Sequence, residues 1–293
     1  MTTPHIAHLP DRGVVSVTGD GARAFLDNLI TNDMDLLDRQ DALHAGLLTP
    51  QGKILFAFFV VPVPDGYLLE TGRAQVADLL KRLTLYRLRA KVTLNDLSTS
   101  RTVIATWGGP PPHVPLAVAY ADPRAPGLGH RQIMAPEMAA KLAAEDAGIA
   151  AYDRHRIALG VPEAGRDYML ADAFPHEACF DRMSGVSFTK GCFVGQEVVA
   201  RMQHKTVVRK RVVRIAAEGT LTEGAEIRLG EASIGRVGSV VGAQGLALLR
   251  LDRAVEAKAK DQPLTANGVA IVVDEQALAA YAAEGAARSP PSL

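Results

Sequence analysis

Apolar and polar positions in the first hundred residues follow two different periods. Two-residue alternation and short apolar runs, bounded by turn residues, predict strands over 14–17, 42–48, 53–61, 67–70 and 91–95. Helical spacing of apolar residues predicts helices over about 20–29 and 73–88. The resulting order β-α-β-β-β-α-β is typical of a split βαβ, ferredoxin-like unit with one added strand.

The pattern changes twice further along the chain. A strand begins at 101–107, and the glycines and prolines of 108–112 then interrupt the pattern, which we take as an internal break near 100–112. Helices are expected over 136–146 and about 150–159. After Arg211, short β-rich runs alternate with glycine turns, which favours a small antiparallel barrel or sandwich. These runs are 212–216, 226–229, 233–241, 246–251 and 269–273.

We therefore predict an α+β protein with three parts. An α+β region covers 1–210, a C-terminal β-barrel covers 211–284, and a disordered tail covers 285–293.

Composition narrows the class of protein only modestly. The chain has 293 residues, 48% of them hydrophobic, with 32 basic and 32 acidic side chains, so net charge does not indicate a polyanionic partner. Two cysteines are too few for a disulfide framework, the N-terminus has no secretory pattern, and the longest apolar run, 54–64, is too short to span a membrane. These features predict a cytoplasmic protein with no membrane partner.

One cysteine lies in an unusual stretch, TKGCFVGQE, at 189–197. Gly195 can start a helix that runs to about His204, so Cys192 would lie just before a helix N-terminus and near Lys190. Both would lower the pKa of the thiol and make it reactive. The alternative is a small residue buried in a turn, because free cysteine is often simply buried.

A permanent metal site has little support. His176, Cys179 and Cys192 give the spacing H-x2-C-x12-C, with no CxxC pair and no fourth ligand at a familiar distance along the chain. We predict no permanent metal, although two cysteines could still hold a transient cluster between two chains.

Charged and polar residues on either side of this stretch offer further candidates. Glu197 and Arg201 are spaced i, i+4, which is typical either of a surface pair on a helix or of a carboxylate placed for a ligand. The segment 201–214 holds six Arg or Lys and no acid, so it either attracts phosphates and a polyglutamyl tail or is a solvated surface. Thr31-Asn32-Asp33 can cap a turn or present side chains to a ligand.

Several runs together resemble a known family. They are Thr31-Asn32-Asp33, LTPQGK at 48–53, YRLR at 86–89, GVPE at 160–163 and, above all, KGCFVGQE at 190–197. They resemble the YgfZ family of folate-binding proteins, which is related to the glycine-cleavage T-protein (an aminomethyltransferase) and includes mitochondrial assembly factors for 4Fe–4S proteins.

The resemblance implies a fold, a ligand and a role. The fold would be two interleaved ferredoxin-like α+β subdomains around a central channel, followed by a β-barrel. The ligand would be tetrahydrofolate in that channel, and the role would be assembly or repair of iron–sulfur proteins, including tRNA-modifying enzymes. Cys192 would be the functional thiol, and the folate site would draw on Glu197, Arg201, Lys190, Gln196, Asn32 and Asp33.

Two departures from the family pattern bear on activity. The related aminomethyltransferases carry acidic residues on the strand that corresponds to Ile54–Phe58, and this strand has none. Without a carboxylate to position the reacting nitrogens, the glycine-cleavage reaction is not expected. Phe193 replaces the commoner tyrosine, which removes one phenolic hydrogen bond.

Three hypotheses follow. The first is a folate-dependent accessory protein of iron–sulfur metabolism, not a conventional enzyme, whose partners are folate and client or assembly proteins. The second is a folate-dependent aminomethyl- or methyltransferase. The third is an RNA-binding module, supported only by the basic run 201–214, so nucleic acid is not expected as a direct partner.

Overall fold

The structure is a computed structural model that describes residues 3–142 and 145–288. These residues form two compact units, each described here by itself. The first comprises the chain up to Tyr152 together with Phe180–Gln196, and the second comprises Asp153–Cys179 together with the chain from Glu197 onward. The divisions fall inside helix α4 (Ile149–Ala158) and in the first turn of helix α5 (Gln196–Lys205).

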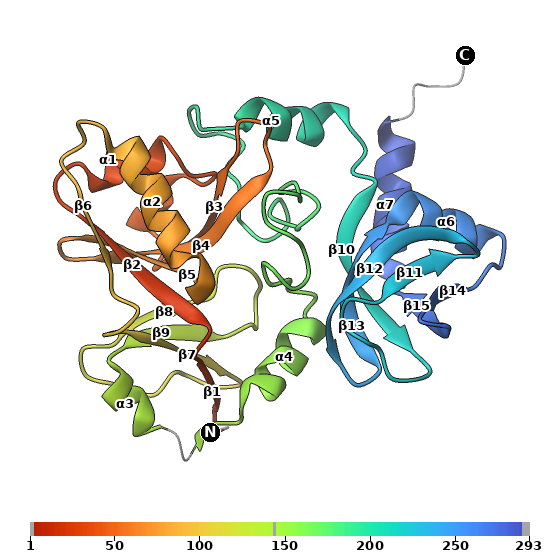
Figure 1. Cartoon of the computed structure of the whole chain (residues 1–293), viewed down its shortest axis with the longest axis horizontal. Coiled ribbons are helices and arrows are strands. Elements are labelled where there is room, and N and C mark those ends of the chain that lie inside the picture. The colour runs from red at the N-terminus through yellow and green to blue at the C-terminus, as the bar shows by residue number, and fades with distance from the viewer. Residues whose placement is uncertain (1–2, 143–144, 289–293) are drawn as a thin grey trace. The chain divides into compact units, whose positions relative to one another are not determined.

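The first unit contains a five-stranded antiparallel sheet with the order β3-β4-β5-β2-β6 (Figure 1). Its strands are β2 (Arg12–Thr18), β3 (Leu43–Leu48), β4 (Ile54–Val63), β5 (Gly66–Gly72) and β6 (Thr93–Asp96). Strands β6, β2, β5 and β4 have the order of a ferredoxin-like sheet, and β3 is added at the edge beside β4, which confirms the prediction for this region.

Two helices cover one face of this sheet. They are α1 (Ala22–Asp27) and α2 (Val76–Arg87), with the short 3₁₀ helices η1 (Met34–Asp38) and η2 (Arg73–Gln75) beside them. Val15, Val17, Leu79 and Leu83 are fully buried between helices and sheet, because each lies at the strand or helix period that faces this core.

The first unit also contains a four-stranded antiparallel sheet that the sequence pattern only partly revealed. Its order is β1-β7-β9-β8, from β1 (His5–Leu9), β7 (Thr102–Trp107), β9 (His130–Met134) and β8 (Val118–Ala121). The chain starts in this sheet, builds the five-stranded sheet, and then returns, so the two are interleaved as predicted. Only β7 was predicted. Helix α3 (Pro136–Ala140) is shorter than the predicted 136–146.

The second unit contains a closed six-stranded barrel, which confirms the predicted barrel (Figure 1). Its strands, in barrel order, are β10 (Lys210–Ala217), β13 (Gln244–Arg250), β12 (Ala232–Val241), β11 (Glu226–Leu229), β14 (Leu264–Ala266) and β15 (Val269–Val273). The barrel closes because β10 pairs with both β13 and β15.

Beside the barrel lie two helices, which the sequence pattern did not predict. They are α6 (Leu251–Ala259) and the alanine-rich α7 (Glu275–Arg288), which pack against each other. Helix α7 continues through Arg288, into the segment predicted as a disordered tail, and the rest of that segment, 289–293, lies outside the described residues. Among the described residues, the helices are all too short or too polar to cross a membrane.

Candidate functional site

The segment 187–195 carries Cys192 and leads into helix α5. Cys192 is exposed, whereas Cys179, the other cysteine, is buried and its thiol donates to the carbonyl oxygen of Val212 at 3.3 Å. Neither cysteine is in a disulfide. The protein therefore presents one accessible thiol, and it lies in the segment that the sequence singled out.

Lys190 anchors this segment to the end of helix α1. Its side chain is only 2% exposed, and Nζ lies 3.0 Å from the Asp27 carboxylate. Nζ also donates to three carbonyl oxygens, of Asp27 at 2.6 Å, Ile30 at 3.2 Å and Asn32 at 2.7 Å. Carbonyl groups at the end of a helix have no helical donors, so the buried ammonium donates hydrogen bonds to them. It also interacts favourably with the negative end of the helix dipole.

The Thr31-Asn32-Asp33 motif holds the residues that directly precede this segment. Thr31 Oγ1 donates to the carbonyl of Gly185 at 2.6 Å, and Asn32 Nδ2 donates to the carbonyl of Ser184 at 2.6 Å. Asp33 caps η1, because its carboxylate accepts from the backbone N–H of Asp35 at 2.9 Å. The side chains of Lys190, Asn32 and Asp33 are thus occupied by protein groups, and contact with folate stays a prediction for them.

Gly195 brings two of the sequence motifs into contact. Its φ is +81°, and a Cβ added there would lie 2.6 Å from the carbonyl oxygen of Thr49 and 2.9 Å from Cα of Gly52. Only glycine fits this approach. In contrast, a Cβ added at Gly191 in the same segment would meet nothing within 4 Å. The hairpin turn 49–52 and the KGCFVGQE stretch therefore form one surface.

Helix α5 begins at Gln196, one residue later than the sequence indicated, and carries the two predicted charges. Glu197 lies in its first turn, and both Glu197 and Arg201 are exposed. Within residues 3–142 and 145–288, no ion pair joins the two side chains and neither has a hydrogen-bonding partner. Half-buried Gln196 donates its backbone N–H to the carbonyl of Phe193 at 3.2 Å. Glu197 and Arg201 are therefore open to a ligand.

The basic run 201–214 is not one exposed surface. Arg211 is buried, and Arg214 pairs with Asp274, with Nε 2.7 Å from Oδ2. This arrangement weakens the only local support for an RNA-binding module.

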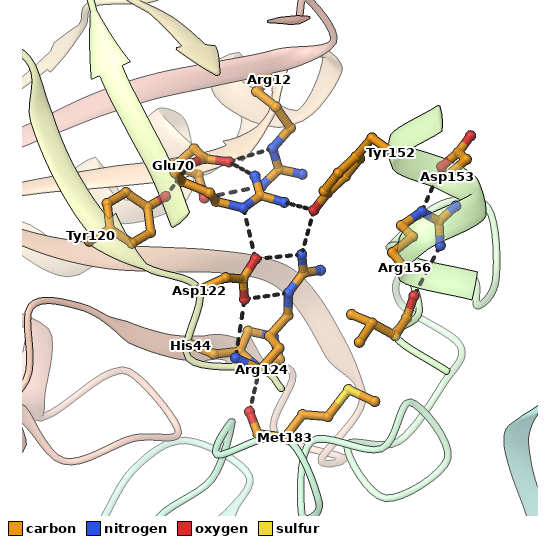
Figure 2. A network of polar contacts seen from close by, with 12 residues as sticks. Arg12, His44, Glu70, Tyr120, Asp122, Arg124, Tyr152, Asp153, Arg156 and Met183 are labelled. Carbon is orange, nitrogen blue, oxygen red and sulfur yellow. Dashed lines mark hydrogen bonds and ion pairs between the residues drawn. The ribbon is translucent and has the colours of Figure 1, made fainter. Parts of the chain in front are cut away.

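A network of charged side chains, which the sequence did not indicate, is buried between the two sheets of the first unit (Figure 2). Glu70 on β5 accepts from Arg12 Nε at 2.8 Å and also contacts Tyr120 and Arg131. Arg131 in turn lies 2.9 Å from Asp122, which also binds Arg124. Arg124 and Arg131 stack over the ring of Phe59, 4.9 and 4.7 Å from its centroid.

This network keeps the carboxylate of Asp122 ionised inside the protein. Burial alone would raise the pKa of the Asp122 carboxyl, but the guanidinium groups of Arg124 and Arg131 outweigh it and hold that pKa well below its usual range. Burial raises the pKa of the Tyr120 hydroxyl, and the neighbouring Glu70 charge raises it further. Glu70 is fully engaged here and does not replace the carboxylate that strand β4 lacks.

A pattern signal for this network exists, although it was not recognised. Glu70 directly follows the apolar residues of YLLETG, and Arg131 lies two residues before the apolar pair of HRQIM, so each is a charged residue inside a short, partly apolar strand. A charged residue at a buried strand position requires an opposite charge. The sequence does not say which residue supplies it, because Glu70 and Arg131 are 61 positions apart.

The second unit has its own buried arginine. Arg156 on α4 binds Asp153 at 2.6 Å, Asp167 at 2.9 Å and Ser239 Oγ at 2.5 Å. Asp167 also accepts from the backbone N–H of Ser239 at 2.7 Å. These contacts fasten the segment 153–167 to barrel strand β12.

Metal-ligating side chains do not gather in the part of the chain that the structure describes. No group of three or more His, Cys, Asp or Glu there could hold a metal ion. Of the three residues considered from the sequence, His176 and Cys179 are buried in the second unit, and Cys192 belongs to the first.

Comparison with known proteins shows which family this chain belongs to. A model of the C-terminal β-barrel domain of CAF17 matches residues 209–280, which cover the barrel. A protein from Chaetomium globosum, named iron–sulfur cluster assembly factor IBA57 homolog, mitochondrial, is 30% identical over 84% of this chain and 71% of its own length. The chain belongs to the IBA57 family of iron–sulfur cluster assembly factors.

Other members of the IBA57 family agree. The relative from Mycosarcoma maydis is 35% identical over 73% of this chain, and the one from Aspergillus oryzae is 32% identical over 71%. Both are named mitochondrial iron–sulfur cluster assembly factors, and the chain spans only 58% and 56% of their lengths. The aminomethyltransferase of the glycine cleavage system from Bartonella henselae has the same fold, with a TM-score of 0.73 and 16% identity over 94% of this chain and 86% of that one.

These relatives confirm the sequence resemblance in its coarser form and correct one prediction. The chain is a member of an iron–sulfur assembly family with an aminomethyltransferase-like fold, and the finer assignment to YgfZ stays a prediction. The predicted cytoplasmic location was wrong, because the relatives are named as mitochondrial proteins. Few cysteines indicate a reducing compartment but do not distinguish one such compartment from another.

Proposed function

We propose that this chain is a folate-binding accessory protein that assembles or repairs iron–sulfur clusters, with Cys192 as its working thiol. The observation that carries the proposal is the contrast between the two cysteines. Cys192 is exposed on a segment that is held by the buried side chain of Lys190 and by hydrogen bonds from Thr31 and Asn32 to the residues just before it, whereas Cys179 is buried. An accessible thiol on a firmly held segment suits reversible contact with a cluster or with a client's thiol.

The family supports a role in cluster assembly, because the relatives are named iron–sulfur cluster assembly factors. The resemblance found in the sequence further implies that the clients would be 4Fe–4S enzymes, including those that modify tRNA. The partners of this chain would then be cluster-assembly proteins and their clients. Aminomethyl transfer is not proposed, because β4 carries no carboxylate and the likeness to the aminomethyltransferase concerns the fold.

Replacement of Cys192 by serine tests the proposal. In cells that lack the native chain, the variant should fail to restore a 4Fe–4S enzyme under oxidative stress, while its melting temperature stays within about 2 °C of the native value because the site is exposed. Full restoration by the Cys192→Ser protein would reject a working thiol at this position.

The proposed folate site uses the exposed charges of helix α5. Glu197 would accept paired hydrogen bonds from the N–H groups of the pterin, and Arg201 would meet the carboxylates of the glutamate tail. Both side chains are exposed and lack a partner among the described residues, which supports a ligand-binding role for them.

Calorimetric titration with tetrahydrofolate tests the ligand. We expect binding that folinic acid competes for and that Glu197→Ala weakens at least tenfold, since a charged hydrogen-bonding pair is lost. The matched control is Asp78→Ala, which removes an exposed acid from the first turn of helix α2 and should leave binding unchanged. No heat, or equal binding by both variants, would reject this site.

A further inference from the structure

The C-terminal end of helix α2 and the turn that follows it carry an unusual concentration of positive charge. Between Lys81 and Lys91 the sequence KRLTLYRLRAK has five cations and no acid. The five are Lys81, Arg82, Arg87, Arg89 and Lys91, and all are exposed. We call this stretch, 81–91, the α2 patch. It contains the YRLR run, for which the Cys192 site provides no role.

The cations of the α2 patch form a group without acidic partners in the described parts of the chain. Several arginines elsewhere do have acidic neighbours, as in Arg23 with Asp35, Arg228 with Glu226 and Arg253 with Glu256, whereas single exposed cations such as Arg201 have none within residues 3–142 and 145–288. In the α2 patch, by contrast, none of the five has an ion pair or a side-chain hydrogen bond within the part of the chain that the structure describes. Asp78, the nearest acid on the helix, pairs with none of them. The helix dipole favours a cation in the last turn, such as Arg87, but no carboxylate among the described residues neutralises the group of five.

Two large apolar side chains lie among these cations. Leu85 is 63% exposed and Leu88 is 88% exposed. Lys81 and Leu85 are spaced i, i+4 on one face of the helix, and Leu88 is the C-cap residue that directly follows the helix. The opposite face carries Leu79 and Leu83, which are buried against the five-stranded sheet. Helix α2 has thus already buried its apolar face, and the two leucines contribute nothing to that core.

Leu88 also has an unfavourable backbone conformation. Its φ and ψ are 42° and −105°, and the N–H of Ala90 donates to the carbonyl of Arg87 at 2.7 Å. This is the geometry of a type II′ turn with Leu88 at the position where glycine is strongly preferred. An exposed leucine in this conformation costs stability without an internal contact to offset it, which points to a use on the outer surface.

We propose that the α2 patch is a docking surface for an acidic helix of a partner protein, in which apolar side chains are bordered by carboxylates. Leu85 and Leu88 would pack against the apolar side chains of that helix, and the five cations would form the charged rim that steers and orients the partner. This surface is separate in residues from the Cys192 segment and does not depend on the proposed folate site.

Charge and side-chain type favour a protein over other polyanions. RNA-binding surfaces stack bases on exposed aromatic rings, and Tyr86, the only aromatic residue of the patch, is half-buried against the core. Helices that lie on membranes insert a broad apolar face, and here that face is already covered by the sheet.

The test is binding of a defined probe, a glutamate-rich helical peptide with two leucines at i and i+4, followed by backbone amide NMR of the whole protein. We expect chemical-shift changes at 81–91 and binding that weakens at least tenfold in the triple variant Arg82→Glu, Arg87→Glu, Arg89→Glu. A control triple variant, Arg228→Glu, Arg250→Glu, Arg253→Glu, makes the same change of charge at exposed arginines that have acidic neighbours, and it should bind the peptide normally.

A second variant separates the leucines from the charge. Leu88→Gly should raise the melting temperature by roughly 2–4 °C, because glycine accepts this turn conformation, and should still weaken peptide binding at least threefold. The proposal is overturned if the peptide does not bind, if both triple variants bind it equally, or if Leu88→Gly leaves binding unchanged. It is also overturned if phosphatidylserine vesicles or a single-stranded RNA bind the α2 patch more tightly than the peptide.

Discussion

Lys190 shows how a single residue can determine the position of a reactive group. Its ammonium ion is buried against three carbonyl oxygens and one carboxylate, all from the stretch 27–32, which is about 160 positions earlier in the chain. Because Cys192 lies two residues away, these contacts fix the backbone that presents the thiol. A residue first considered as a ligand for folate thus also has a clear structural role.

Removal of this ammonium should destabilise the first unit. Lys190→Met leaves buried carbonyl groups without a donor, so we expect the free energy of unfolding to fall by about 2–3 kcal/mol. The control Lys81→Met, at an exposed lysine without a partner, should change it by less than about 0.5 kcal/mol. Urea unfolding measures both, and equal effects would show that the Lys190 contacts do not stabilise the fold.

The two thiols should differ in reactivity in the folded protein. We expect one thiol to react rapidly with Ellman's reagent, because Cys192 is exposed, and the second only after unfolding, because Cys179 is buried. The Cys192→Ser protein should lose the rapid phase and keep the slow one. Two rapid thiols in the native protein would contradict the burial of Cys179.

At the scale of elements, the turn 49–52 and the segment before helix α5 depend on each other. Gly195 lies close to the backbone of Thr49 and Gly52 and has a positive φ, so a side chain there is excluded on two grounds. Gly191 belongs to the same motif but faces open space. The two glycines therefore provide a matched pair of positions for testing this contact by substitution.

Alanine at these two positions should affect the stability of the fold differently. Gly195→Ala should lower the free energy of unfolding by about 1–3 kcal/mol and impair restoration of a 4Fe–4S enzyme, since the Thr49 turn must move. Gly191→Ala should change stability by less than about 0.5 kcal/mol. Thermal melting of both variants measures this difference in stability. Similar melting temperatures would indicate that the close contact between Gly195 and the turn 49–52 is not required for stability.

At the scale of the whole molecule, the first unit depends on ionised groups between its two sheets. The folded pKa of Asp122 is held below the unfolded value of about 3.9 by Arg124 and Arg131. A depressed pKa means that the carboxylate stabilises the fold above that value and that this stabilisation is lost as the pH falls below about 4.

Asp122→Asn should therefore have an effect that depends on pH. At pH 7 we expect the free energy of unfolding to fall by about 3–5 kcal/mol, because two buried guanidinium groups lose their carboxylate. The difference from the native protein should narrow below pH 4. Fluorescence of Trp107, the sole tryptophan, reports on this unit during urea unfolding. A difference that stays constant from pH 7 to pH 3 would contradict this account. The exposed-site control Asp35→Asn should cost less than about 1 kcal/mol.

The sequence by itself determined the elements whose periodicity is local. Strands 42–48, 53–61 and 67–70, helix 73–88 and the barrel runs after Arg211 all follow from side-chain alternation or helical spacing within a few residues. The resemblance to a known family, not a local period, gave weight to KGCFVGQE and drew attention to the absence of a carboxylate from strand β4.

Only the tertiary structure decided which distant residues meet. Strand β1 pairs with β7 across about a hundred residues, Glu70 meets Arg131, and Lys190 reaches the end of helix α1. No local period encodes such pairings, because they depend on how whole elements pack and on where a buried charge finds its counterpart. For the same reason the pattern identified Cys192 as a candidate, while the packing around Lys190 and Gly195 decided how it is held.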